Sequence, residues 1–229
     1  MIELYKIYLN GVYGGNMNKI TKIDRWYNIK DIILVIGAAF FPVLLFVLVK
    51  LFEEKVYFIL SADNFLSLHI FLEFSSVVMS FAVFAITYYT FEGSKRLSMV
   101  IIAYTFLLVA LLDTFHTFSY KGMPSFFTKS CINRATIFWI AARLTMALGM
   151  MGANLIFGRV YLKKKNPIGL ICIIIFAILL FVLVNCYPYM FPVLFIEGQG
   201  LTPIKIVLEY IIILIQLITI GICINLYKR

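Results

Sequence analysis

Two histidines and two carboxylates stand at matching places in two neighbouring apolar segments of this chain. His69 and Glu73 lie four residues apart near the start of one segment, and Asp113 and His116 lie three apart near the end of the next. No other histidine occurs in the sequence. Ionisable side chains inside a bilayer are costly unless they are paired or solvated, so we interpret these residues as a functional site.

The elements that must position this site are long apolar helices. About 20 apolar residues are needed to cross a bilayer as a helix. The chain is 63% hydrophobic and 14% charged, with a mean hydropathy of +0.99, which is far from the composition of soluble domains. Six stretches are long enough: Ile32–Phe52, Leu66–Phe91, Leu97–Tyr120, Ala135–Gly158, Ile168–Tyr187 and Pro203–Leu226. The sequence therefore predicts an all-α polytopic membrane bundle of about six transmembrane helices at 31–229, after a basic segment at 1–30.

Lysine and arginine residues gather in the connections on one side of such a bundle, and this asymmetry sets membrane orientation. The basic residues on that side are Lys6, Lys19, Lys22, Arg25, Lys30, Lys95, Arg96, Arg159, Lys163, Lys164, Lys165, Lys228 and Arg229. We therefore predict that both termini are cytoplasmic and that the histidines face outward. The net charge of +9 is explained by topology and by contact with membrane lipid, so nucleic acid is not an expected partner.

Polar residues of two further stretches are expected to complete the pocket. Helical periodicity places Arg143 and Glu209 on polar faces that turn toward the bundle interior. Three carboxylates, Glu73, Asp113 and Glu209, would then share one cation inside a span, Arg143. An unpaired buried carboxylate takes up a proton or requires a bound cation. The sequence therefore predicts an outward-facing ligand site that holds a small ligand, a proton or a metal ion.

Two imidazoles among carboxylates suit zinc, copper or nickel better than calcium or magnesium. The metal hypothesis takes His69, Glu73, Asp113 and His116 as ligands, with copper or zinc as the ion. A haem bound by both histidines is less favoured, because Glu73 and Asp113 would place charge against the macrocycle. The structural alternative is that these side chains form hydrogen bonds between helices, with Arg143 neutralising one carboxylate.

Cysteine, glycine and lysine positions predict three further features. Cys131 and Cys186 would both lie toward the outer side, where an oxidising environment permits a disulfide. Gly149 and Gly152 are expected to let a neighbouring helix approach closely. Lys205 lies at the start of the last stretch and is expected to reach toward the lipid headgroups.

Three runs of residues resemble the third type of bacterial membrane-associated sensor domain. They are His69 to Glu73, Leu111 to Pro124 with its Tyr-Lys-Gly-Met-Pro sequence, and Asn133 to Arg143 with its Arg-Ala-Thr-x-Phe-Trp-x-Ala-Ala-Arg sequence. The similarity extends from about Ile32 onward. Such domains are the multi-helix sensor modules of inner-membrane proteins that carry a histidine kinase, a diguanylate cyclase or a PAS domain.

The resemblance implies a sensory input domain without enzymatic activity, located in the bacterial inner membrane and acting as a homodimer. Because the chain ends at Arg229, just after the last expected helix, we expect the output domain to follow in a longer protein or to belong to a separate chain. A looser similarity to the copper-binding membrane region of ethylene receptors favours copper, although Leu112 stands where that pattern has a cysteine. The alternative is a small transporter or a haem or metal redox membrane protein.

Overall fold

The computed structural model describes residues 40–53, 62–125, 129–164 and 166–227, together with Ile33, Ile36, Gly37 and Lys55. The chain divides into two units, Met1–Ala62 and Asp63–Arg229. The first unit contains an apolar helix at Phe40–Leu51, which is the described part of the first expected span. The basic segment at 1–30 and the predicted domain boundary at 31 lie outside the described residues.

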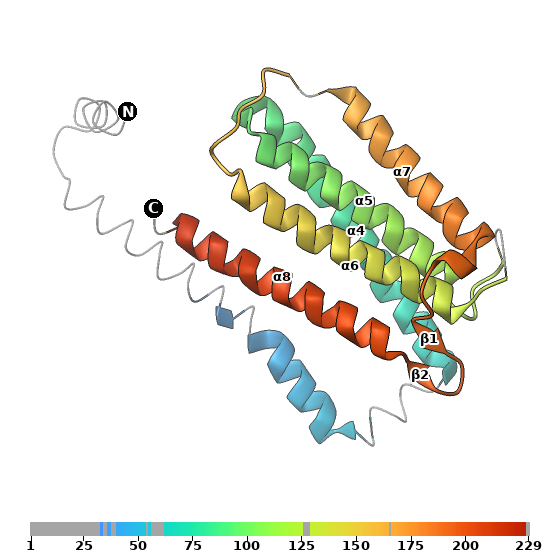
Figure 1. Cartoon of the computed structure of the whole chain (residues 1–229). Coiled ribbons are helices and arrows are strands. Elements are labelled where there is room, and N and C mark those ends of the chain that lie inside the picture. The colour runs from blue at the N-terminus through green and yellow to red at the C-terminus, as the bar shows by residue number, and fades with distance from the viewer. Residues whose placement is uncertain are drawn as a thin grey trace, which may run out of the picture. The chain divides into compact units, whose positions relative to one another are not determined.

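Five helices in the rest of the described chain are long and apolar enough to cross a membrane (Figure 1). They are α4 (Ala62–Ser94), α5 (Leu97–Ser119), α6 (Ile132–Leu155), α7 (Pro167–Cys186) and α8 (Pro203–Tyr227). These helices confirm that the five apolar stretches expected from Leu66 onward are helical, with small shifts at their ends. That each of them crosses the membrane stays a prediction. The prediction that both termini are cytoplasmic stays a prediction.

Helix α5 is the central element of this bundle. In its most apolar window 56% of the residues are buried, compared with 11% in α4, α7 and α8. Helix α5 packs most extensively on α6, α6 packs on α8, and α7 lies along another side of α5 (Figure 1). Ring contacts between His69 and His116 near one end and between Tyr88 and Tyr104 near the other show that α4 runs antiparallel to α5.

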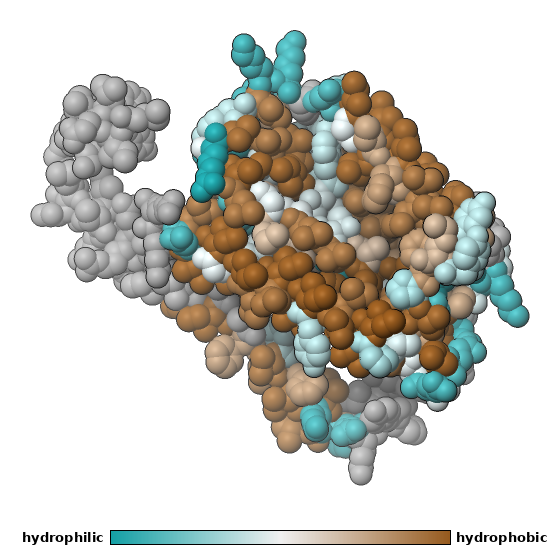
Figure 2. All heavy atoms as spheres, in the orientation of Figure 1, coloured by the Kyte–Doolittle hydropathy of each residue, from teal (hydrophilic) through white to brown (hydrophobic). Residues whose placement is uncertain are grey.

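The apolar core lies where α5, α6 and α7 meet. The ring of Phe181 on α7 lies 4.6 Å from that of Phe115 on α5 and 6.0 Å from that of Phe138 on α6, measured between centroids. Elsewhere the helices present apolar side chains outward. Figure 2 shows a face with a mainly hydrophobic middle and with strongly hydrophilic residues mostly at its margins, as contact with lipid requires.

The connections at one end of the bundle are tied to each other. Helix α4 ends at a tight turn in which Lys95 has a φ of 51°. The Leu162 N–H donates to the Lys95 carbonyl at 2.8 Å, and Arg96 forms an antiparallel bridge with Tyr161. The connections at this end carry the basic residues Lys95, Arg96, Arg159, Lys163 and Lys164.

A short hairpin covers the opposite end, between α7 and α8. It follows the 3-10 turn η1 (Pro188–Met190) and consists of β1 (Phe195–Ile196) paired antiparallel with β2 (Gly200–Leu201). The Asn133 side chain at the start of α6 holds this segment, because its Oδ1 accepts hydrogen bonds from the Leu194 and Phe195 N–H groups at 2.7 and 3.0 Å.

The predicted disulfide between Cys131 and Cys186 is wrong for this structure. Both residues are free, exposed cysteines. Cys131 precedes α6, where its N–H donates to the Ser119 carbonyl at the end of α5, and Cys186 closes α7. The position of each thiol is therefore set by the end of its own helix and not by a bond to the other cysteine.

Candidate functional site

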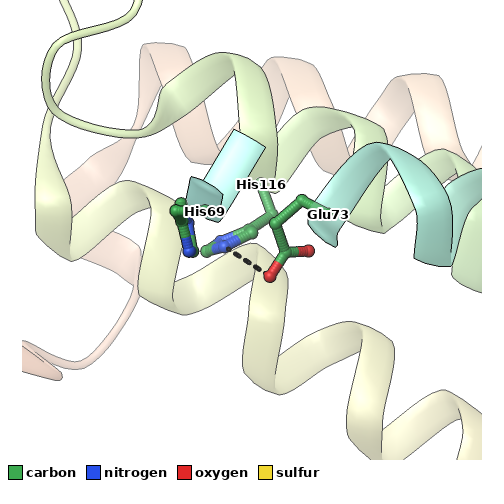
Figure 3. Close-up of side chains that lie close together, drawn as sticks. All are labelled: His69, Glu73 and His116. Carbon is green, nitrogen blue, oxygen red and sulfur yellow. Dashed lines mark ion pairs between the residues drawn. The ribbon is translucent and has the colours of Figure 1, made fainter. Parts of the chain in front are cut away.

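Three of the predicted site residues form one compact group, which we call the histidine–glutamate cluster: His69, Glu73 and His116. His69 and Glu73 come from α4 and His116 comes from α5 (Figure 3). One ligand-type atom from each of the three residues lies within 4.8 Å of the other two. The His116 Nε2 atom lies 3.8 Å from the Glu73 Oε1 atom.

Local helix geometry explains why these side chains meet. Residues four apart lie on the same face of a helix, so His69 and Glu73 both face α5 from the first turns of α4. His116 lies in the last turn of α5, which the antiparallel packing sets beside the start of α4. Aromatic rings complete the surroundings, because the Tyr120 and Phe65 ring centroids lie 4.1 and 5.9 Å from that of His69.

The backbone of α6 fixes the orientation of His116. Its Nδ1 lies 2.7 Å from the Ala135 carbonyl oxygen. A carbonyl only accepts hydrogen bonds, so Nδ1 carries the proton and donates. In the neutral ring the lone pair is then on Nε2, which faces Glu73. A backbone carbonyl orients many metal-binding histidines in the same way.

Each member of the cluster has a buried polar atom without a partner. Within the described part of the chain, His69 Nε2, Glu73 Oε2 and His116 Nε2 make no hydrogen bond. A buried donor or acceptor left unpaired costs roughly 1–3 kcal/mol. Unpaired atoms on three adjacent side chains indicate that the cluster can accept a further group.

Asp113, the fourth predicted metal ligand, is paired elsewhere. Its side chain is 0% exposed, and the Arg143 Nη2 atom donates to both of its carboxylate oxygens at 2.8 and 2.7 Å. Asp113 therefore fits the structural alternative, in which Arg143 neutralises one carboxylate, and it is not a member of the histidine–glutamate cluster.

Glu209 also has a cationic partner. The Lys205 Nζ atom lies 2.7 Å from Glu209 Oε1, one helical turn away on α8, and 5.1 Å from the centroid of the Trp139 ring. Lys205 is buried, so the prediction that it reaches toward the headgroups is wrong. The spacing of four residues between Lys205 and Glu209 was the sequence signal for this pair.

The two ion pairs isolate Glu73. Asp113 is neutralised by Arg143 and Glu209 by Lys205. Among the described residues, Glu73 contacts His116 and contacts no lysine or arginine. Of the three carboxylates, Glu73 is thus the one without a lysine or arginine partner among the described residues, and it lies beside two imidazoles.

Arg143 and Glu209 meet at a second feature, a groove of about 370 Å³ between α6 and α8. Its polar and aromatic lining consists of Trp139, Arg143, Glu209, Tyr210 and Gln216, and isoleucines of α8 supply the rest. We call this the α6/α8 groove. The six predicted site residues are thus divided among the cluster, the Asp113–Arg143 pair and this groove, and Arg143 belongs to the last two.

Sequence reasoning missed several groups that shape these sites. Trp139 lines the groove and lies between the cations of Arg143 and Lys205, at 5.9 and 5.1 Å from its ring centroid. The Ala135 carbonyl orients His116, and no sequence pattern marks a backbone carbonyl for that purpose. Trp139 could have been found from the sequence, because it is an aromatic residue within the run Asn133 to Arg143 that carries the resemblance.

Comparison with known proteins gives one match. The family model described as MASE3, membrane-associated sensor domain, matches residues 60–229. The match begins after the first expected span and includes α4 to α8 and every residue of the candidate sites. No match was found among curated proteins or among solved structures. The matched residues make up most of the chain, and the chain therefore belongs to the MASE3 family of membrane-associated sensor domains.

Proposed function

We propose that this chain is the sensory input domain of a bacterial inner-membrane signalling protein and that its histidine–glutamate cluster binds zinc or copper. The observation that carries the proposal is a group of three side chains from two helices whose ligand-type atoms lie within 4.8 Å of one another. Among the described residues, the Nε2 atoms of both histidines in this group have no hydrogen-bond partner. Two imidazole nitrogens and one carboxylate oxygen form a common donor set for such ions.

Charge and hydrogen bonding favour a metal ion over a proton at this site. A proton shared by His116 and Glu73 would pair two of the unpartnered groups and leave His69 Nε2 unsatisfied. A divalent ion contacts all three and offsets the charge of Glu73. Three protein ligands also leave a fourth coordination position open for water or a second ligand.

Binding would change the spacing of two helices. Zinc–ligand bonds of about 2.0–2.2 Å in a tetrahedron separate the donor atoms by only about 3.4 Å. The donor atoms of the cluster spread over as much as 4.8 Å. A bound ion would therefore draw the start of α4 toward the end of α5. The ion would then bind the arrangement with the two helices closer together more tightly than the other arrangement. A sensor needs this difference, because a ligand shifts a conformational equilibrium only by its differential affinity for the two states.

The Asp113–Arg143 pair offers a route from the cluster to the last helix. Asp113 precedes His116 by one turn of α5 and holds Arg143 of α6, which lines the groove against α8. Movement of α5 would pass through this pair to α8. In the proposed signalling protein, α8 leads toward a kinase, cyclase or PAS output domain, in the same chain or a separate one, and the sensor acts as a homodimer.

The distribution of basic residues supports an outward-facing cluster. Lys95 and Arg96 lie in the turn that follows the end of α4, whereas His69 lies near the start of that helix. Basic connections stay in the cytoplasm of bacterial membrane proteins. The cluster would then lie near the outer surface, where it can sample ions outside the cell.

Metal content tests the proposal. The detergent-purified wild type, loaded with zinc or copper and freed of excess ion, is compared by mass spectrometry with His69→Ala/His116→Ala and with Glu209→Gln. The last variant is a matched control, because it removes a carboxylate from the bundle outside the cluster. We expect near-stoichiometric metal in the wild type and the control, and loss in the double variant. Equal metal in the double variant, or equal loss in the control, would show the proposal to be wrong.

A further inference from the structure

Arg143 has hydrogen-bond donors to spare beside the α6/α8 groove. Its Nη2 atom makes both bonds to Asp113. Among the described residues, neither its Nε atom, which is buried, nor its Nη1 atom has a hydrogen-bond partner. Inside a bilayer no water replaces these bonds, so a guanidinium with free donors calls for an acceptor.

The acceptor must come from a neutral molecule. The positive charge of Arg143 is already offset by Asp113, and that of Lys205 by Glu209. An anionic ligand such as a fatty acid would place a third carboxylate beside Asp113 and Glu209, at a cost that rises as the dielectric constant falls. A carbonyl oxygen accepts hydrogen bonds without adding charge.

The walls of the groove suit a flat, apolar body. Trp139 and Tyr210 provide aromatic surfaces, isoleucines of α8 provide aliphatic ones, and Gln216 provides an amide that both donates and accepts. A volume of about 370 Å³ is within the range of small-molecule sites. Such a lining, with few polar groups at fixed places, is typical of sites for aromatic ligands with polar substituents.

We propose that the α6/α8 groove binds a neutral, lipid-soluble aromatic molecule with ring carbonyl groups, the chemical class of the quinones. One carbonyl oxygen accepts from Arg143, the ring packs against Trp139 and Tyr210, and Gln216 bonds to a second polar group of the ligand. This site is separate from the histidine–glutamate cluster and does not depend on the binding of a metal there.

Tryptophan fluorescence provides the test. The chain has two tryptophans, Trp26 and Trp139, so a Trp26→Phe background leaves the groove tryptophan as the only one. The full-length chain in detergent is titrated with menadione, and in parallel with methylnaphthalene, which has the same ring system without carbonyls. We expect saturable quenching by menadione and none by methylnaphthalene.

Three variants in the same background identify the groups responsible. Arg143→Lys keeps a cation beside Asp113 but removes the spare planar donors, and it should weaken menadione binding about tenfold or more. Gln216→Leu should weaken binding less. Leu214→Ala, at an exposed position of α8 outside the groove, is the matched control and should bind as the background protein does. Circular dichroism of each variant separates a lost contact from a lost fold.

The proposal is overturned if menadione gives no saturable quenching, as when a second copy of the chain covers the groove. Equal quenching by methylnaphthalene, which would mean partition into the detergent, also overturns it. So does unchanged affinity in folded Arg143→Lys and Gln216→Leu.

Discussion

The Arg143 Nη2 atom lies 2.8 and 2.7 Å from the two carboxylate oxygens of Asp113, and this contact joins α5 to α6. Asp113 is completely enclosed, and His116 of the histidine–glutamate cluster follows it by one helical turn. The pair therefore has two consequences. It removes Asp113 from the set of available metal ligands, and it places Arg143 between the cluster and the α6/α8 groove.

Breaking this pair should destabilise the bundle strongly. Asp113→Ala leaves the guanidinium of Arg143 without its counter-ion, and loss of one partner of a buried pair costs about 3–5 kcal/mol. Thermal unfolding in detergent, followed by circular dichroism, measures the effect. The double variant Asp113→Ala/Arg143→Leu should recover part of the loss, because no unpaired charge remains. Strictly additive destabilisation would show that the two residues do not act as a pair.

Close packing of α5 on α6 depends on Gly149. A Cβ atom at this position would collide with the Thr105 side chain, whereas one at Gly152 would meet nothing within 4 Å. We expect Gly149→Ala to lower the free energy of unfolding by about 1–3 kcal/mol, the usual cost of overpacking. Gly152→Ala is the control and should not destabilise the protein. If both variants unfold at the same temperature as the wild type, the packing described here is incorrect.

The hairpin between α7 and α8 should be loosened by Asn133→Ala. Its side chain accepts from two backbone N–H groups, of Leu194 and Phe195, and both would lose their partner. Hydrogen–deuterium exchange of the peptide that contains these residues should become faster, by an amount that corresponds to about 1–3 kcal/mol. Gln199→Ala, at an exposed position in the turn of the same hairpin, should leave the exchange of that peptide unchanged.

Most of the helices could be predicted from the sequence because a bilayer allows few alternatives. Backbone groups in lipid must be bonded within the segment, so each long apolar stretch after Leu66 becomes a helix. The first stretch is described only from Phe40 to Leu51 as a continuous helix, and its role as a span stays a prediction. The spacing of His69 and Glu73 likewise sufficed to place both on one face.

The side-chain contacts between helices were harder to predict than the helix face on which each residue lies. The three-residue spacing puts Asp113 and His116 on one side of α5, but rotation of the neighbouring helices decides that Asp113 meets Arg143 and that His116 meets Glu73. Gly149 and Gly152 show the same limit, because only the position of Thr105 makes one of them a close contact. The prediction that Lys205 reaches toward the headgroups is wrong because Glu209, one helical turn away, provides a carboxylate that binds its ammonium group inside the bundle.

Zinc binding should weaken as the pH falls. Histidine binds a metal through a neutral ring nitrogen, so protons compete with zinc for His69 and His116, and binding releases protons. Isothermal titration of the detergent-purified chain at several pH values, in buffers of different ionisation enthalpy, measures both the affinity and the protons released. An affinity that does not change between mildly acidic and neutral pH would argue against imidazole ligands.

The most direct test of the histidine–glutamate cluster as a metal site is X-ray absorption spectroscopy of the zinc-loaded chain at the zinc edge. We predict two imidazole nitrogens and carboxylate or water oxygen at about 2.0–2.2 Å, and loss of the imidazole scattering in His69→Ala/His116→Ala. The four exposed cysteines are the competing donors in the described chain. Sulfur scattering at about 2.3 Å without an imidazole signature would place the ion on thiols and contradict the account.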